Sequence, residues 1–429
     1  MNHPLQALAP VGQSITVEQV ESLVADFLQK HDFRNKRVLC IVPDGTRTAP
    51  LGRLFRGFHA RAAGQAKQID LMIALGTHPA MTDAQILQRM EWTPAERHST
   101  FASVRVFNHT WDQPETLRRL GTIPAAEISD LSGGLFAMDV PVDINARVFD
   151  YDILLVMGPV FPHEVVGFSG GNKYFFPGIG GAEILNFFHW LGAVVTNPMI
   201  IGNKWTPVRK VVDRAAALIP QEKLCLAMVV DEKHDYGLFG GDTVSCWDAA
   251  SDLSARVHIT YEPRAYRQVL SCAPPMYDEL WVAGKCMYKL EPVLADGAEL
   301  IIYAPHLHEV SLVHGKLITE IGYHCRDYFL KQWDRFKDYP WGVLAHSTHV
   351  HGIGTYENGV ETPRARVVLA TGIPEEVCRK INLGYRDPAS IRVEDFRDRE
   401  EQGILYVPKA GERLYHQAKK PLWAGGQCV

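Results

Sequence analysis

The chain alternates short apolar runs with segments whose apolar residues recur at helical spacing. Residues 16–30 show that spacing, and Thr16 with Gln19 forms a capping-box pattern at its start, so a helix is predicted there. A second helix is predicted at about residues 51–63, and Thr82 with Gln85 repeats the capping-box pattern before a third. Strands are predicted at residues 37–42, 69–75, 153–157, 224–230, 279–283, 299–303 and 366–370.

This alternation predicts an α/β protein in which mainly parallel sheets are flanked by helices. A chain of 429 residues is long enough for two domains, each with its own core. A boundary is predicted near residues 265–275, which divides the chain into domains 1–265 and 266–429, with the final residues expected to pack back on the first domain. We expect the active site in the cleft between the two domains.

Composition narrows the classes of function. The formal net charge of −5, without a basic block, argues against a nucleic-acid partner. The absence of an apolar run of membrane-spanning length and of a signal-peptide pattern favours a cytoplasmic protein. The eight cysteines are scattered singly, a spacing that suits neither a disulfide framework nor a structural zinc site.

Polar residues follow several predicted strands directly. Ligands of open parallel sheets lie beyond the carboxyl ends of the strands, so these residues are the first candidates for a site. They are Asp44, Arg47, His78, His163, Lys285 and His306. Asp44 and Arg47 are either an ordinary turn aspartate with an exposed arginine, or a pair in which Arg47 binds a carboxylate or phosphate. His78 and His163 are either satisfied loop histidines or a pair that moves protons near neutral pH.

Residues 162–189 form the most unusual segment, because glycines, two histidines and a lysine are crowded between aromatic residues. One interpretation is an anion-binding turn at Gly170 and Gly171 with the charge of Lys173, although no Ser or Thr follows the lysine as in a phosphate-binding loop. Another is that His163, Lys173 and His189 face one cleft and act on a small molecule. A plain surface loop is less favoured, because aromatic neighbours indicate that the segment folds inward.

Two further groups of histidines have alternative interpretations. His346, His349 and His351 have the spacing of a metal-ligand cluster, but the wall of a substrate cleft is the preferred interpretation, and alternation along a strand would place His349 and His351 on one face. Among His306, His308 and His314, His306 is expected to face the cleft. His109 and Asp112 are interpreted as a capped turn with a structural role.

Taken together, the motifs PDGTR, ALGTH and PHEVVGFSGGNKYFFPG, followed by a histidine on the next helix, resemble the nickel-pincer nucleotide-dependent lactate racemase family. The resemblance is strongest from Asp44 to His189. The segments after Lys285 and around residues 346–361 depart from the lactate enzyme, which suggests a homologue acting on another 2-hydroxy acid, such as a hydroxy-dicarboxylate or a sugar acid.

The resemblance implies a nickel(II) pyridinium-3,5-bisthiocarboxylic acid mononucleotide as cofactor. It implies that Lys173 bonds covalently to one sulfur-containing arm and that His189 completes the nickel ligands. His78 and His163 match the two catalytic histidines, and Lys285, with Lys289 as the fallback, matches a substrate-binding lysine. The segment Asp44, Gly45, Thr46 and Arg47 contacts cofactor and substrate, with Arg47 on the substrate, and Gly170 and Gly171 pass close to the cofactor.

The chemistry of a 2-hydroxy acid agrees with this assignment. The C2 hydrogen is a poor acid, so its removal as hydride to a cationic pyridinium, together with loss of the hydroxyl proton, offers an easier route to inversion. Two histidines are then needed, one as the base for each enantiomer of the substrate. The expected function is a 2-hydroxy-acid racemase or epimerase with a small-molecule substrate and compatible with a homo-oligomer. The alternatives are a metal-dependent hydrolase built on His346, His349 and His351, and a non-catalytic protein that binds a small acid or a nucleotide.

Overall fold

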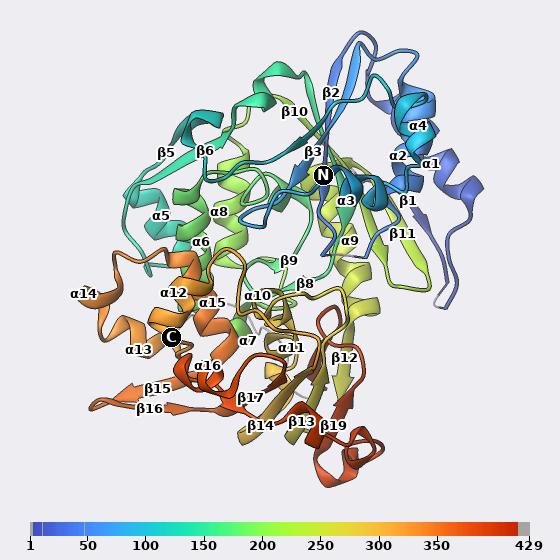
Figure 1. The fold of residues 1–429 in the computed structure, drawn as a ribbon. Coiled ribbons are helices and arrows are strands. Elements are labelled where there is room, and N and C mark those ends of the chain that lie inside the picture. Colours follow the sequence, from blue (N-terminus) through green and yellow to red (C-terminus); the bar gives the residue numbers. More distant parts are fainter. Residues whose placement is uncertain (1–2, 11, 47, 419–429) are drawn as a thin grey trace.

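Two sheets organise the computed structural model, which describes residues 3–10, 12–46 and 48–418 (Figure 1). The first sheet has seven strands in the order β1-β11-β10-β7-β2-β3-β4. Strands β10, β7, β2, β3 and β4 run parallel, whereas β11 pairs antiparallel with both β10 and β1. The bounds are β1 Leu5–Leu8, β2 Arg37–Pro43, β3 Gln68–Ala74, β4 Val106–Asn108, β7 Ile153–Pro159, β10 Glu222–Val230 and β11 Asp235–Asp242.

Helices cover both faces of this sheet, because the central strands carry apolar side chains on both faces. Val38, Cys40 and Val42 of β2 pack with helices α1 (Val17–Lys30) and α2 (Leu51–Ala62). Leu39 and Ile41 belong to the core on the opposite face, which is covered by α5 (Ala125–Ser132), α6 (Ala182–Val195), α8 (Pro207–Ala216) and α9 (Thr243–His258). In the part of the chain that the structure describes, no helix is long and apolar enough to cross a bilayer.

The second sheet has five parallel strands in the order β18-β17-β14-β13-β19. One face packs against α15 (Trp341–His351) and the shorter α10 (Leu280–Ala283), α11 (Lys285–Tyr288), α12 (Gly315–Ile321) and α16 (Glu375–Lys380). The other face is smaller and includes Phe396 from an irregular segment. The strands are β13 Tyr266–Cys272, β14 Leu294–Ala304, β17 Ala365–Thr371, β18 Gly384–Tyr385 and β19 Ile404–Val407.

The α/β fold class with parallel sheets flanked by helices is confirmed, and six of the seven predicted strands fall on β2, β3, β7, β10, β14 and β17. The strand predicted at residues 279–283 is wrong, because Leu280–Ala283 is helix α10 and leads directly into α11. A run of five mostly apolar residues cannot separate a strand from a buried helical turn, and here the helical turns bury Leu280, Ala283 and Cys286 in the second core.

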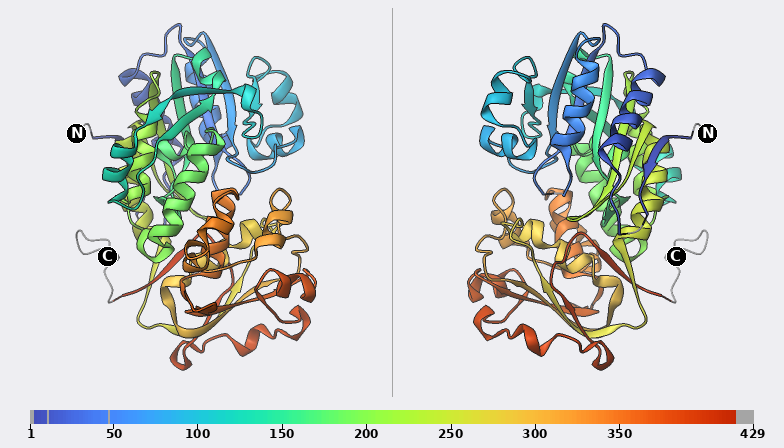
Figure 2. Two further views of the ribbon diagram at one scale, coloured as in Figure 1. Left: turned by 90° about the vertical axis from the view of Figure 1, so that its left-hand side faces the viewer. Right: turned by 90° about the vertical axis from the view of Figure 1, so that its right-hand side faces the viewer.

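The two halves meet along helices α6 and α15 (Figure 2). The backbone N–H of Gly342, at the start of α15, donates to Oδ1 of Asn186 on α6 at 2.8 Å. Strand β20 (Leu414–Gln417) returns to pair in parallel with β12 (Ile259–Glu262), which directly follows α9. The division into domains 1–265 and 266–429 stays a prediction, and the last eleven positions lie outside the described residues.

Both predicted capping boxes are present, at Thr16 with Gln19 and at Thr82 with Gln85. Replacing Thr16 with Ala removes the side-chain acceptor for the Gln19 N–H and is expected to lower the free energy of unfolding by about 1 kcal/mol. Urea denaturation monitored by circular dichroism measures this change. Thr16→Ser keeps the hydroxyl and serves as the control, so an equal loss in both variants would contradict the capping role.

Candidate active site

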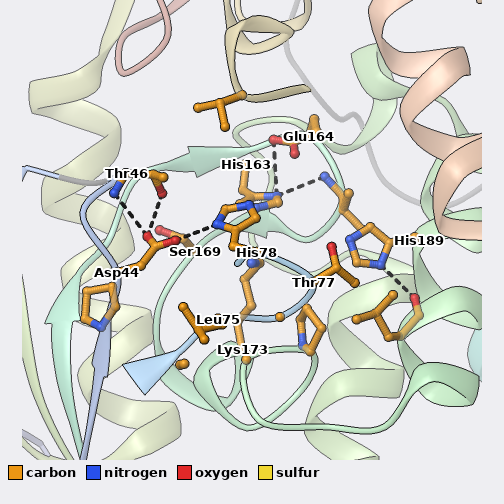
Figure 3. A pocket seen from close by; sticks show the side chains of 18 of the residues that line it. Asp44, Thr46, Leu75, Thr77, His78, His163, Glu164, Ser169, Lys173 and His189 are labelled. Carbon is orange, nitrogen blue, oxygen red and sulfur yellow. Dashed lines mark hydrogen bonds and ion pairs between the residues drawn. The ribbon is translucent and has the colours of Figure 1, made fainter. Parts of the chain in front are cut away.

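A pocket opens between the two sheets and gathers most of the side chains that the sequence singled out (Figure 3). We call it the central pocket. The candidates that line it are Asp44, Thr46, His78, His163, Gly170, Lys173, His189 and Lys285. Gly45 lines an adjoining cavity, Gly171 lies buried behind the pocket wall, and Arg47 lies outside the described residues.

Asp44, at the end of β2, orients His78, at the end of β3. Nδ1 of His78 donates to Oδ2 of Asp44 at 2.5 Å, while Oδ1 of Asp44 accepts from the N–H and the hydroxyl of Thr46. Burial opposes the charge of Asp44, but His78 and the Thr46 hydrogen bonds outweigh it and hold the pKa of this carboxyl far below its usual value. An ionised Asp44 fixes the Nδ1 proton and presents Nε2 of His78 as the reactive nitrogen.

His163 follows β7 in the short strand β8 (Pro162–His163), which pairs with β9 (Gly167–Phe168). Its Nδ1 accepts the backbone N–H of Val165 at 3.1 Å and lies 3.3 Å from a carboxylate oxygen of Glu164. His163 and Glu164 both line the central pocket, and Figure 3 shows Glu164 directly above the His163 ring. Each of the two candidate catalytic histidines therefore has a carboxylate beside Nδ1.

His189 lies on α6, in the wall of the central pocket. Its Nδ1 donates to the carbonyl of Leu185 at 2.7 Å, and because a carbonyl can only accept, the proton is on Nδ1 and Nε2 keeps a lone pair. Burial lowers the pKa of His189 to about 4, so the ring is neutral at pH 7. A neutral imidazole whose second nitrogen is fixed by a carbonyl is the usual form of a histidine that binds a metal.

The glycine-rich turn is shaped by packing behind it. Gly170 and Gly171 have φ of +88° and +56°, where L side chains are strained. A Cβ on Gly170 would lie 2.6 Å from Cγ2 of Val160, and one on Gly171 would lie 2.8 Å from Cβ of Trp247 on α9. These two glycines are thus required by the conformation and by close contact with β7 and α9, whatever else approaches the turn.

Arg209 on α8 fixes the same turn from inside the protein. Its guanidinium is fully buried, donates to the carbonyls of Phe168 (2.5 Å) and Gly170 (3.4 Å), and lies over the Trp247 ring. Trp247 itself donates to the carbonyl of Ser169 at 3.1 Å. Three successive carbonyls are therefore held from behind, and the short helix Gly171–Tyr174 that follows brings Lys173 into the central pocket.

The second half of the chain supplies the opposite wall. Lys285 on α11 is buried, with Nζ 4.8 Å from the centre of the Tyr277 ring, and it lines the central pocket. Lys289, the fallback for the substrate lysine, donates instead to the backbone carbonyls of Pro162 and Glu412 and does not line this pocket. The structure therefore brings Lys285, and not Lys289, to the pocket.

The segment with His346, His349 and His351 is helix α15 and not a strand, so His349 and His351 do not share a face as they would in a strand. Helical spacing turns His346 and His349 to the central pocket, whereas His351 lies 3.8 Å from Glu361 outside it. His346 stacks on Trp281 and bonds its carbonyl at 2.8 Å. Among the described residues, no three or more His, Cys, Asp or Glu side chains are grouped to hold a metal ion.

The remaining histidines lie away from the central pocket. His306 bonds the carbonyl of Tyr277 at 3.0 Å and does not line the pocket, contrary to expectation. His314 packs on Trp281, and His308 lies against Gly372. His109 is buried and bonds the carbonyl of Gly180 and the side chain of Asn145, which agrees with a structural role.

Sequence reasoning missed two features of the pocket. Glu164 was not selected, although a carboxylate inside the apolar run FPHEVVGF is a signal of a specific partner. The helical position of His349 was not predicted, although its neighbours Leu344, Ala345 and Val350 are the apolar residues of a buried helix. Neither ring nitrogen of His349 has a hydrogen-bond partner among the described residues, and burial lowers its pKa to about 4.

Buried histidines make the stability of the protein sensitive to mild acid. Burial lowers the pKa of His109 from its ordinary 6.5 to about 4. Between these values the unfolded chain binds a proton that the folded chain does not, so the free energy of unfolding falls as the pH drops from 6.5 to 4, by up to about 1.4 kcal/mol per pH unit for one histidine.

His109→Gln is expected to reduce that slope, even if the variant is less stable at every pH, because the titrating group is gone. Urea unfolding at a series of pH values between 4 and 7 measures the slope. The exposed His98 gives the control His98→Gln, and identical slopes for wild type and His109→Gln would contradict the assignment.

Comparisons with known proteins show what the first half of the chain is similar to. Residues 19–199 match the model of the lactate racemase N-terminal domain. A lactate racemase from Thermoanaerobacterium thermosaccharolyticum is 27% identical over 153 residues, which are 35% of this chain and 31% of that protein. The aligned segment thus spans under a third of that relative.

Two solved structures share the fold. A Thermotoga maritima protein, solved by a structural genomics consortium, superposes with a TM-score of 0.86 at 32% identity and covers 95% of this chain and 100% of its own. The lactate racemase apoprotein from Thermoanaerobacterium thermosaccharolyticum superposes with a TM-score of 0.69 at 16% identity, over 93% of each chain, which shows a common fold. The match at residues 19–199 thus supports, for that part of the chain, the lactate racemase family that the motifs resemble.

Proposed function

We propose that this protein is a racemase or epimerase that inverts C2 of a 2-hydroxy acid by hydride transfer, with a nickel-pincer pyridinium nucleotide joined to Lys173. The observation that carries the proposal is the convergence of His78, His163, Lys173, His189 and Lys285 on one pocket in a chain of this family. The match to a lactate racemase domain supports racemisation in general. The residues that line the pocket support hydride and proton transfer as its mechanism.

The residues present fit the proposed cofactor. His189 offers one unprotonated nitrogen, since Nδ1 is committed to Leu185. Sulfur donors with one imidazole suit nickel(II). Lys173 reaches the same pocket from a turn that is held rigid by Arg209, which suits a residue that must carry a covalent attachment. When bound, the cofactor supplies an electrophile that accepts a hydride and returns it.

The side chains of the pocket have distinct roles in this proposal. Lys285 binds the substrate carboxylate, and its burial strengthens that contact by excluding water. His78 and His163 exchange the hydroxyl proton, each serving as base for one enantiomer and as acid for the other. Asp44 keeps Nε2 of His78 directed at the substrate. The contribution of Arg47 to the carboxylate stays a prediction, because that residue lies outside the described part of the chain.

Covalent attachment at Lys173 is testable by mass. Protein produced in cells that synthesise the pincer nucleotide is expected to carry a mass adduct and about one nickel per chain, as a single His189 site requires. Lys173→Ala is expected to lose the adduct, and intact-mass spectrometry with metal analysis measures both quantities.

Lys285→Ala is the matched control, since it removes a pocket lysine that the proposal assigns to substrate rather than to the cofactor. It should keep the adduct and the nickel but lose turnover. A wild-type chain without an adduct, from cells shown to make the cofactor, would contradict the proposal and favour a non-catalytic binding protein.

Hydride transfer also predicts the fate of the C2 hydrogen. A 2-hydroxy acid deuterated at C2 should keep its deuterium through inversion in ordinary water, because the label travels with both electrons and does not mix with solvent protons. Chiral chromatography with mass spectrometry follows the label in the product. Complete loss of deuterium to solvent at the rate of inversion would show proton transfer instead.

A further inference from the structure

The two candidate catalytic histidines have similar surroundings with one difference. Each has a carboxylate close to Nδ1, Asp44 at 2.5 Å from His78 and Glu164 at 3.3 Å from His163. In addition, the N–H of Val165 donates to Nδ1 of His163 at 3.1 Å. Nδ1 of His163 thus faces both a group that accepts a proton and a group that supplies one.

These two contacts select opposite forms of the ring. When Val165 donates to Nδ1, that nitrogen carries a lone pair and the proton of a neutral ring is on Nε2. Such a ring cannot take a proton at Nε2. When the proton is on Nδ1 and is accepted by Glu164, Nε2 has the lone pair that a base needs. A carboxylate at this place also stabilises the imidazolium that forms when the base has worked.

We propose that Glu164 is the positioning residue of His163, which draws the ring proton to Nδ1 and so makes Nε2 a base, in competition with the Val165 N–H. The inference rests on the proposed function, since it names what prepares one of its two histidines. Asp44 has the same role for His78, whose Nδ1 it contacts at 2.5 Å.

The protons balance over one inversion. His163, neutral and with its Nδ1 proton accepted by Glu164, would take the hydroxyl proton of one enantiomer at Nε2, and the proposed cofactor would supply the acceptor for the C2 hydride, which leaves a keto acid. With hydride returned to the other face of the keto acid, the protonated His78 would give its Nε2 proton to the oxygen. His163 ends protonated and His78 ends neutral, so the pair exchanges one proton with solvent before the same enantiomer reacts again.

The low exposure of Glu164 suits this role. Its side chain is 14% exposed, and that of His163 is 6% exposed, so the pair is shielded from water. In such a place a carboxylate holds a neighbouring imidazolium more strongly than it would at the surface. Glu164 also lies within electrostatic range of His189 and His349 on the other pocket walls, whose pKa values it raises slightly against the lowering by burial.

The test measures the first half of the reaction, which is keto acid formation, for each enantiomer alone. Loaded enzyme in excess is mixed with one enantiomer, the reaction is quenched on the millisecond scale, and the keto acid is measured. In Glu164→Gln the amide can donate to Nδ1 and hold the unreactive tautomer. Keto acid formation from the enantiomer that uses His163 should then fall by about 100-fold, with less than about threefold change for the other.

Asp44→Asn is the reciprocal variant and should slow the other enantiomer, while Glu164→Asp keeps a carboxylate and should recover part of the rate. A merely structural role for Glu164 would slow both enantiomers alike, and that result would overturn the inference.

A second measurement does not depend on turnover. Imidazole ¹⁵N shifts of the protein without cofactor, with the His163 signals assigned by their loss in His163→Gln, report which nitrogen carries the proton. The Nδ1–H share should fall in Glu164→Gln and persist in Glu164→Asp, and an unchanged share would overturn the inference. If wild-type enzyme forms no keto acid from either enantiomer, the proposed function fails, and the ¹⁵N result still decides the contact between Glu164 and His163.

Discussion

The buried guanidinium of Arg209 is the interaction on which the pocket depends. Removing a charged group from water costs several kcal/mol, and the structure offsets this with hydrogen bonds to the carbonyls of Phe168 and Gly170 and with the face of Trp247. Burial lowers the pKa of Arg209 to about 10, so the group keeps its charge at neutral pH. Because its hydrogen bonds end on backbone atoms, they fix the path of the chain and not merely one side chain.

That fixed path brings together two kinds of histidine environment. Nδ1 of His189 faces the carbonyl of Leu185, and burial keeps the ring neutral, which is the form that a histidine needs in order to bind a metal. His78 and His163 have carboxylates at Nδ1, which stabilise the protonated form. The pocket thus holds histidines in two environments. The group that faces Nδ1, a carbonyl or a carboxylate, determines whether the ring is kept neutral or is stabilised when protonated.

Much of the fold and part of the site could be predicted, because an apolar run that stops at a polar turn is a strong local signal. The carboxyl ends of parallel strands meet at one edge of a sheet, so the sequence predicts that Asp44, His78 and His163 lie together. Lys285 was expected to follow a strand, and that part of its prediction is wrong, since the run before it is helix α10. It reaches the pocket from α11, which packs against α15.

The features that sequence reasoning did not find depend on contacts distant in the chain. The orientation of His346 and His349 follows from the contact between α15 and α6, which joins residues more than 150 positions apart and has no local signature. Arg209 reads as an ordinary polar residue of an amphipathic helix, and its burial is visible only once α8 and α9 close around the glycine turn. Glu164 could have been found locally, yet its partner atom on His163 could not.

The two halves of the chain contribute different candidate residues to the pocket. The family match ends at residue 199, so it includes Asp44, His78, His163, Lys173 and His189 and excludes Lys285, His346 and His349. Hydride and proton transfer at C2 involve atoms common to all 2-hydroxy acids, and the residues assigned to them lie in the matched half. The rest of the acid must meet the other wall, where Lys285, Trp281 and α15 line the pocket. Under the proposed function, changes in that wall would alter which acid is accepted while the transfer chemistry stays the same. The two histidines proposed to move protons, His78 and His163, lie after β3 and in β8, in the first half of the chain.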